Sequence, residues 1–135
     1  MVESLTVTSR AAEEFIDITA VVQGIVSRST IAEGICVVYT PHTTAAVTIN
    51  ENADPDVCRD ILGHLAKVVP ADKAFRHVEG NSDAHIQASL VGSSVTVLVE
   101  DGRLVLGTWQ SVFFCEFDGP RSRQMHIKLM PSGGV

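Results

Sequence analysis

The sequence predicts one α+β domain over residues 1–135, with mainly antiparallel or mixed β-sheets in a sandwich-like arrangement and two or three helices. Three observations support this fold class. Seven or eight short segments carry strand patterns, and the helical patterns fall between groups of these strands. Several strands are apolar on both faces, and so few helices cannot cover them all. We therefore expect a sheet folded into a sandwich or covered by another subunit.

The N-terminal third contains strands and a short helix, distinguished by their apolar periods. Leu5 and Val7 alternate with threonines, which is the period of two of a half-buried strand. Apolar residues after Thr19, a residue that can cap a helix, follow helical spacing instead. Pro41 ends a β-branched run that is typical of an interior strand. The predicted elements are strands at 4–9, 15–18, 34–40 and 45–49 and a helix at 19–26.

The clearest helix begins at Asp54 and Pro55. Asp54 is a good N-cap, and Pro55 is a good first helical residue. One apolar stripe then recurs at helical spacing, through Val57, Ile61, Leu65 and Val68. The pattern predicts a helix over 55–69, with His64 beside the stripe as a boundary or surface residue.

The last third is predicted to hold one short helix followed by strands. Ser82 or Asp83 can cap a helix through Leu90, and Gly92 ends it. Asp101-Gly102 is a strong hairpin signal between two antiparallel strands. The predicted strands lie at 95–99, 103–106, 107–117 and 121–130. Alternation in the last strand places Met125, Ile127 and Leu129 inward and His126 toward solvent.

Charge and composition exclude several classes of partner. Ten basic against sixteen acidic residues give a net charge of -6 without any Lys/Arg run, so we expect no nucleic-acid partner. No apolar run approaches the roughly 18 to 20 residues that a bilayer requires, and no signal-peptide pattern is present. We therefore expect no membrane partner and a cytoplasmic location. Cys36, Cys58 and Cys115 are odd in number and widely spaced, which predicts reduced thiols.

Three of the five histidines lie in polar segments punctuated by glycine and proline, where a scaffold often carries ligands and catalysts. They are His42, His77 and His85. Three neutral imidazoles leave an open position on a tetrahedral zinc, so the pattern predicts a divalent metal, zinc in particular. The alternative is that each histidine caps or hydrogen-bonds its own loop.

Carboxylates and a small turn surround these histidines. Glu51, Glu79 and Asp83 could orient the imidazoles or act as general acid or base, although a solvated or capping role is equally open. Asn81 and Ser82 could form a phosphate cradle or an ordinary turn, and the free N–H groups of the helix before His85 could receive a phosphate.

Further candidates come from the later strands. Gln110 and Glu116 share a face with apolar residues, where a carboxylate is costly to bury without a partner, so we expect Glu116 to belong to the site. Arg103, Arg121 or a substrate cation could be that partner. Basic residues such as Arg103 could also meet a small phosphorylated ligand.

Four long motifs resemble one known family, the YjbQ-like family, in the right order and over nearly the whole chain. They cover residues 40–55, 79–86, 102–110 and 116–121. The resemblance implies an α+β subunit, a homotrimer, and a metal, often zinc, held by His42, His77 and His85. It also implies a secondary thiamine phosphate synthase activity, which joins hydroxymethylpyrimidine diphosphate to thiazole phosphate with release of pyrophosphate.

Site roles follow from this implied activity. We expect Glu51, Glu116 and Gln110 to be catalytic, and a small phosphorylated substrate to be bound by Asn50, Asn81, Ser82, Asp83 and Arg103. Two alternatives remain open at this point. One is a metal-dependent hydrolase of a small phosphorylated or amide substrate, and the other is a non-enzymatic trimeric protein that binds a metal or metabolite.

Overall fold

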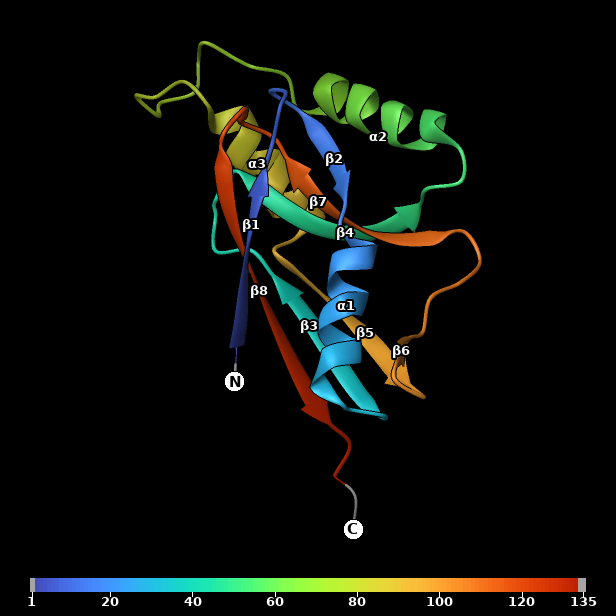
Figure 1. Ribbon diagram of the computed structural model, residues 1–135. Helices are drawn as coiled ribbons and strands as arrows, with labels where there is room; N and C mark the ends of the chain where they lie inside the picture. Colours follow the sequence, from blue (N-terminus) through green and yellow to red (C-terminus); the bar gives the residue numbers. More distant parts are fainter. Residues whose placement is uncertain (1, 134–135) are drawn as a thin grey trace.

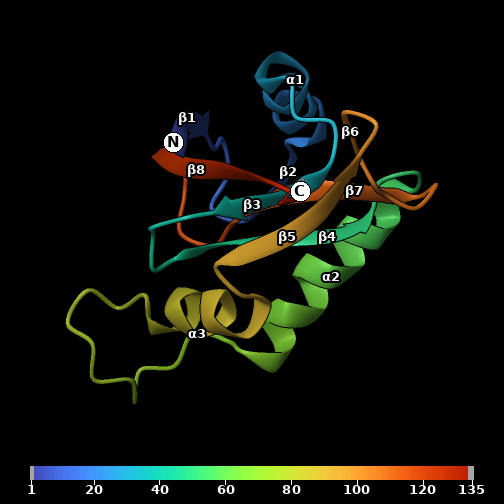
Figure 2. The ribbon, with the colours of Figure 1, turned by 90° about the horizontal axis from the view of Figure 1, so that it is seen from below.

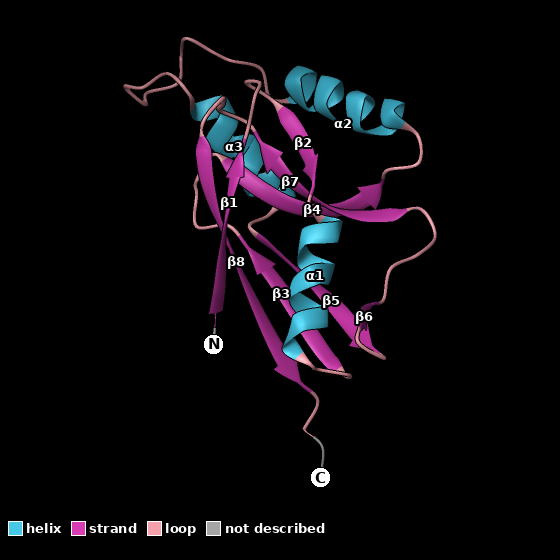
Figure 3. Cartoon of the chain, in the orientation of Figure 1, coloured by secondary structure: helices cyan, strands magenta, loops and turns pink. Residues whose placement is uncertain are grey.

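The computed structural model describes residues 2–133, and it confirms the predicted α+β class with two antiparallel sheets and three helices (Figures 1 and 3). The larger sheet has the strand order β1-β8-β3-β5-β6, and the smaller has the order β2-β7-β4. The strands are β1 (Val2–Thr8), β2 (Glu14–Asp17), β3 (Gly34–Tyr39), β4 (Ala45–Glu51), β5 (Ser94–Glu100), β6 (Arg103–Leu104), β7 (Gln110–Glu116) and β8 (Ser122–Pro131). The helices are α1 (Thr19–Ser29), α2 (Pro55–Val68) and α3 (Ser82–Val91).

Two apolar cores lie on opposite faces of the smaller sheet, with α1 on one side and α2 and α3 on the other (Figure 2). Along β7, Val112 and Phe114 enter the core shared with α1 and the larger sheet, whereas Phe113 and Cys115 enter the core under α2 and α3. This double burial explains why the sequence of β7 is apolar on both faces.

The larger sheet has one buried and one open face. β3 lies between β5 and β8, and its Cys36 and Val38 are fully buried. β3 is an interior strand, as predicted, but only one of its faces is buried, because Tyr39 on the other face is 43% exposed. Toward the other end of β3 on the same face, Leu98 and Met130, the cross-strand neighbours of Ile35, are 60% and 48% exposed. This apolar surface is called the open face below.

Local signals for two of the elements were read correctly. Asp54 caps α2, because its carboxylate accepts the N–H of Asp56 at 2.9 Å. Asp101 and Gly102 both have positive φ, 51° and 71°, as the two-residue turn of a twisted hairpin requires. No helix in the described part of the chain is long and apolar enough to cross a membrane.

Three boundaries differ from the prediction. Thr19 does not cap α1, since Ile18 holds the cap position and the Thr19 hydroxyl donates to Asp17. The strand predicted to begin at Gly107 begins only at Gln110, because a turn closes between them with Gln110 N–H donating to the Gly107 carbonyl at 3.0 Å. β6 also ends earlier than predicted, since it contains only Arg103 and Leu104.

Candidate functional site

A pocket of about 540 Å³ lies between the loop after β3 and one side of α3. His42 and Thr43 line it from the loop, and His85 and Ser89 line it from successive turns of the helix. The loop is held in place by the chain just after α3, since the Thr40 N–H donates to the Ser93 carbonyl at 2.9 Å. The pocket therefore brings together two of the three predicted metal ligands.

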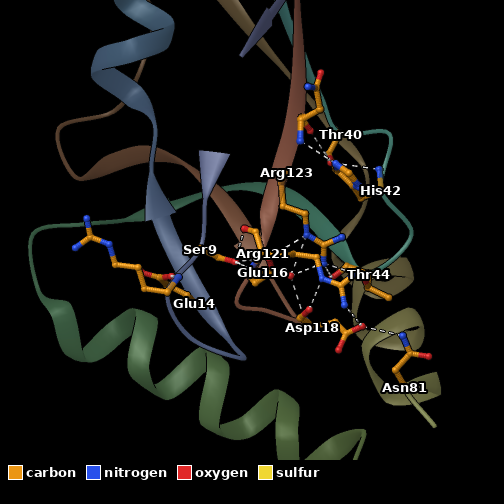
Figure 4. Close-up of polar contacts among 12 residues, drawn as sticks. Ser9, Glu14, Thr40, His42, Thr44, Asn81, Glu116, Asp118, Arg121 and Arg123 are labelled. Atoms are coloured by element: carbon orange, nitrogen blue, oxygen red, sulfur yellow. Dashed lines mark hydrogen bonds and ion pairs between the residues drawn. The ribbon is translucent and has the colours of Figure 1, made fainter. Parts of the chain in front are cut away.

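The ring of His42 is fixed by the backbone of β8 (Figure 4). Its Nε2 accepts the N–H of Gln124 at 2.8 Å. A neutral imidazole has one lone pair, so this bond places the ring proton on Nδ1 and leaves no lone pair for a metal. Burial and the nearby Arg123 guanidinium both lower the pKa of His42, which favours that neutral form. In this structure the His42 ring thus accepts a backbone hydrogen bond, and it has no free lone pair for its predicted role as a metal ligand.

His77 and His85 form the remaining pair of the predicted triad. Their ring centres are 5.2 Å apart and the rings are perpendicular. His85 lies in the first turn of α3, as predicted, where its N–H donates to the Asn81 carbonyl at 3.3 Å. Within residues 2–133, no group of three or more His, Cys, Asp or Glu side chains could hold a metal ion. The structure therefore supplies two adjacent imidazoles rather than three.

Behind the pocket, a buried ion pair joins β7 to β8. Glu116 is completely buried, and its carboxylate accepts hydrogen bonds from Arg123 Nε at 2.9 Å, from Ser9 Oγ at 2.6 Å and from the N–H of Asp118 at 3.0 Å. Arg123 in turn donates to Thr44 Oγ1 at 2.8 Å. Because Glu116 has no exposed surface, this arrangement argues against direct contact with a ligand and points to a role in holding Arg123.

The sequence contained a signal for Arg123 that the prediction missed. Arg103, Arg121 or a substrate cation was expected to partner Glu116, but Arg121 pairs with Asp118 at 3.1 Å instead. The alternation that places Met125 inward on β8 also places Arg123 inward. An inward arginine on one strand and an inward glutamate on another indicate a buried pair.

The predicted cradle at the start of α3 is only partly formed. Asn81 holds the N-cap position, but its side chain does not cap the helix; it donates from Nδ2 to Asp118 at 2.8 Å. This leaves Asn81 Oδ1 buried without a hydrogen-bond partner. Ser82 and Asp83 are half-buried in the first turn, and Glu79 is exposed in the preceding loop.

The other predicted site residues lie far from the histidines. On the paired strands β4 and β7, Glu51 faces Gln110, whereas Ala45 faces Glu116 at the opposite end. Glu51 lies six positions beyond Ala45 along β4, which at about 3.3 Å per residue is roughly 20 Å. A single chain therefore does not bring Glu51 and Gln110 to the pocket. The prediction that both residues act at one site with the histidines is corrected to this extent.

Asn50 and Arg103 are also outside the pocket. Asn50 lies beside Glu51, and its side chain accepts the Glu51 N–H at 2.7 Å. Arg103 belongs to the β5–β6 hairpin, where it lies opposite Glu100 in the strand register. Their predicted contact with a substrate held by His42 and His85 finds no support in the fold of a single chain.

Comparison with known proteins gives consistent relatives. The pattern of the "UPF0047 protein YjbQ-like" family matches residues 3–132. A UPF0047 protein of Methanocaldococcus jannaschii is 52% identical over 87% of this chain and 86% of its own length. YugU of Bacillus subtilis is 49% identical over 96% of this chain and 99% of its own.

Solved structures agree with the sequence relatives. A YjbQ/UPF0047 protein of Clostridium acetobutylicum superposes with a TM-score of 0.93 at 52% identity, covering 95% of this chain and 99% of that one. A protein of Sulfolobus solfataricus, described as being of unknown function, gives a TM-score of 0.93 at 32% identity, over 98% of this chain and 97% of that one.

These relatives correct the predicted activity. They are described only as UPF0047 or YjbQ-like proteins, and none of these descriptions names thiamine phosphate synthesis. The prediction of a thiamine phosphate synthase was therefore wrong as an inference from family resemblance. The hydrolase alternative loses its support as well, because it required a metal triad with Glu51 or Glu79 beside it, and Glu51 lies at the far end of β4.

Proposed function

Because the chain belongs to the UPF0047 YjbQ-like family, whose relatives above are described without an activity, we propose a function from the geometry of its own pocket: binding of a small phosphorylated metabolite between His42 and His85. The observation that carries this proposal is the fixed ring of His42, which is left with an Nδ1–H to offer to a ligand. Such a donor recognises an acceptor, and a phosphate oxygen is a strong one.

The surroundings of His42 favour an anion. Burial lowers the pKa of His42 most, and the charges of Arg123 and Arg121 lower it further. The carboxylate of Glu116 acts in the opposite direction, but it is already engaged by Arg123 and Ser9. The hydroxyl groups of lining serines and threonines add donors that carry no charge.

The test is a titration of the purified protein with inorganic phosphate and with a panel of small phosphomonoesters, followed by NMR and calorimetry. We expect saturable binding that weakens at least about tenfold in His42→Ala, since a hydrogen bond to a charged group contributes about 1.5–3 kcal/mol. His64→Ala is the matched control, because His64 is exposed on α2. Absence of binding, or equal binding by His42→Ala, would overturn the proposal.

The same proposal includes a divalent metal, zinc in particular, on His77 and His85 alone. Two imidazoles on one tetrahedral zinc, with Zn–N about 2.1 Å and each ring centre about 1.1 Å beyond its nitrogen, have centres about 5.2 Å apart. The separation of 5.2 Å between these rings supports such a pair. The unpartnered Asn81 Oδ1 is a further oxygen donor in the same region. When bound, the metal would supply a positive charge for a phosphate.

Metal content after dialysis tests this part separately. His77→Ala and His85→Ala should each lose most of the zinc, because one remaining imidazole is a weak site. His42→Ala should keep it, since the His42 lone pair is already used. Zinc loss in His42→Ala together with full retention in His77→Ala would contradict the pair.

A homotrimer is the proposed assembly. Its support is the open face of the larger sheet, where Tyr39, Leu98 and Met130 are each at least 43% exposed on adjoining strands. Large apolar side chains exposed on one face of a sheet are typical of an interface. Light scattering should give the mass of three 14.5 kDa chains, and a single-chain mass at micromolar concentration would refute it.

The proposed location is the cytoplasm. Its support is that the three cysteines are free, as is usual in a reducing compartment.

A further inference from the structure

Two consecutive residues of β8 hold the pocket loop. The Arg123 side chain donates from Nη2 to Thr44 Oγ1 at 2.8 Å and to the Thr44 carbonyl at 3.3 Å. The next peptide N–H, that of Gln124, donates to His42 Nε2 at 2.8 Å. Thr40 reaches the same residue from the other end of the loop, since its hydroxyl donates to the Gln124 carbonyl at 3.4 Å. The loop is therefore fastened to β8 on both sides of His42 (Figure 4).

Arg123 is itself immobilised. Its side chain is 3% exposed, and Glu116 accepts from both its Nε and its Nη2. Ser9 and the Asp118 N–H hold the Glu116 carboxylate on its other side. The planar guanidinium of Arg123 is therefore held in one position. A group that accepts its hydrogen bonds is fixed in position as well. Beyond Glu116, the contacts of Arg123 are with Thr44 of the pocket loop.

We propose that Arg123 is a positioning residue, which holds residues 40–44 against β8 so that His42 keeps its bond to the Gln124 N–H and offers Nδ1–H to the ligand. This inference rests on the ligand pocket proposed above. It adds an explanation of why the His42 ring carries its proton on Nδ1. Without the Arg123–Thr44 contact, the hydrogen bonds that remain between the loop and β8 within the described residues are those of His42 and Thr40 to Gln124. The Phe117 N–H would still donate to the Thr44 carbonyl at 3.2 Å, but it lies outside β8. The His42 ring could then leave the Gln124 N–H, and its proton could move to Nε2.

Two matched variants separate positioning from stability. Thr44→Val removes the hydroxyl that Arg123 contacts on the loop side, and Ser9→Ala removes the hydroxyl that Glu116 contacts on the far side. Thr44→Val deletes one hydrogen bond of this buried network, whereas Ser9→Ala deletes the bond to Glu116 and also the contacts of Ser9 Oγ with the Arg121 N–H and carbonyl. Ser9→Ala is therefore the harsher change to the network, and both variants leave the Glu116–Arg123 pair in place. Only the first acts on the loop. Thr44→Ser keeps the hydroxyl and serves as the conservative rescue.

The readout is the tautomer of His42, taken from long-range proton–nitrogen correlation NMR of the imidazoles at one pH where the ring is neutral. Wild type, Ser9→Ala and Thr44→Ser should show the Nδ1–H form. Thr44→Val should shift toward Nε2–H and bind inorganic phosphate about five- to tenfold more weakly, the effect of one ordinary hydrogen bond.

A folded Thr44→Val that keeps the Nδ1–H form and the wild-type affinity would overturn the inference. An equal loss of affinity in Ser9→Ala would overturn it too, since that result means general destabilisation. If Thr44→Val does not fold, Arg123→Lys decides, because lysine keeps the charge beside Glu116 but lacks the fork that reaches Thr44. Should wild type bind no phosphate, the proposed function fails, but the tautomer measurement still settles the role of Arg123.

Discussion

Breaking the Glu116–Arg123 pair should be among the most damaging single changes in this protein. Glu116→Gln removes a charge that is completely buried and leaves the Arg123 cation, also buried, without its partner. Removing one partner of a buried ion pair costs about 3–5 kcal/mol. For a chain of this size, each kcal/mol corresponds to a fall of roughly 3–4 °C in Tm, so we expect a loss of about 10–20 °C.

A double-mutant cycle measured by urea unfolding tests that reasoning. Glu116→Leu and Arg123→Met should each destabilise strongly, whereas the double variant should be more stable than either single one. The reason is that the apolar pair leaves no unpaired charge in the core. If the two single effects simply add in the double variant, the pair is not coupled, and the assignment of Glu116 as the anchor of Arg123 is refuted.

The same carboxylate predicts how stability depends on pH. Burial raises the pKa of Glu116, but hydrogen bonds from Arg123, Ser9 and the Asp118 N–H outweigh it, and the net pKa is lowered. Because the pKa of Glu116 is lower in the folded than in the unfolded state, its contribution to stability is fully present above the pKa of the unfolded state. The contribution is lost as the pH falls through the pKa of the folded state. Urea midpoints between pH 3 and 7 should therefore fall more steeply toward acid for wild type than for Glu116→Gln, and equal slopes would contradict this.

Three further predictions concern parts of the fold outside the network. Asp54→Ala removes the α2 cap and should cost about 1 kcal/mol, seen as a small fall in the Tm. Gly34→Ala would place a Cβ 2.1 Å from the Met130 carbonyl oxygen, so we expect a loss of about 1–3 kcal/mol or more in urea unfolding. Leu98→Glu puts a charge on the open face and should convert the proposed trimer to single chains in light scattering, with circular dichroism unchanged.

Local chemistry explains which elements could be predicted from the sequence. The Asp54 cap, the Asp101-Gly102 turn and the inward alternation of Met125 and Ile127 each depend on neighbours along the chain. The division into two sheets does not. Val112 and Phe113 are both buried, but in different cores, and periodicity cannot distinguish that from a strand buried by a single partner.

The site was less accessible to sequence reasoning, because its decisive contact is remote. The Gln124 N–H that occupies His42 lies 82 residues further along the chain. A histidine pattern predicts ligands only where the imidazole lone pairs are free, and a backbone donor leaves no trace in the side-chain sequence. The burial of Arg123 could have been predicted, because Arg123 lies two residues before the inward-facing Met125 on the same strand.

The motifs that carry the family resemblance predict one site. A single chain, however, places Glu51 and Gln110 at one end of the paired strands β4 and β7 and the pocket at the other end. Glu51 pairs with Gln110 about six residues, or roughly 20 Å, from Ala45 beside the pocket. Glu51 is half-buried, and roughly 20 Å is more than twice the Debye length of about 8 Å in physiological salt, so its charge acts only weakly on the pocket. Glu51→Gln should therefore leave the His42 tautomer and the phosphate affinity of the pocket unchanged, measured as above, with His42→Ala as the positive control. A clear loss of affinity in Glu51→Gln would contradict a pocket formed by one chain, because only the Glu51 of another copy could then reach the ligand.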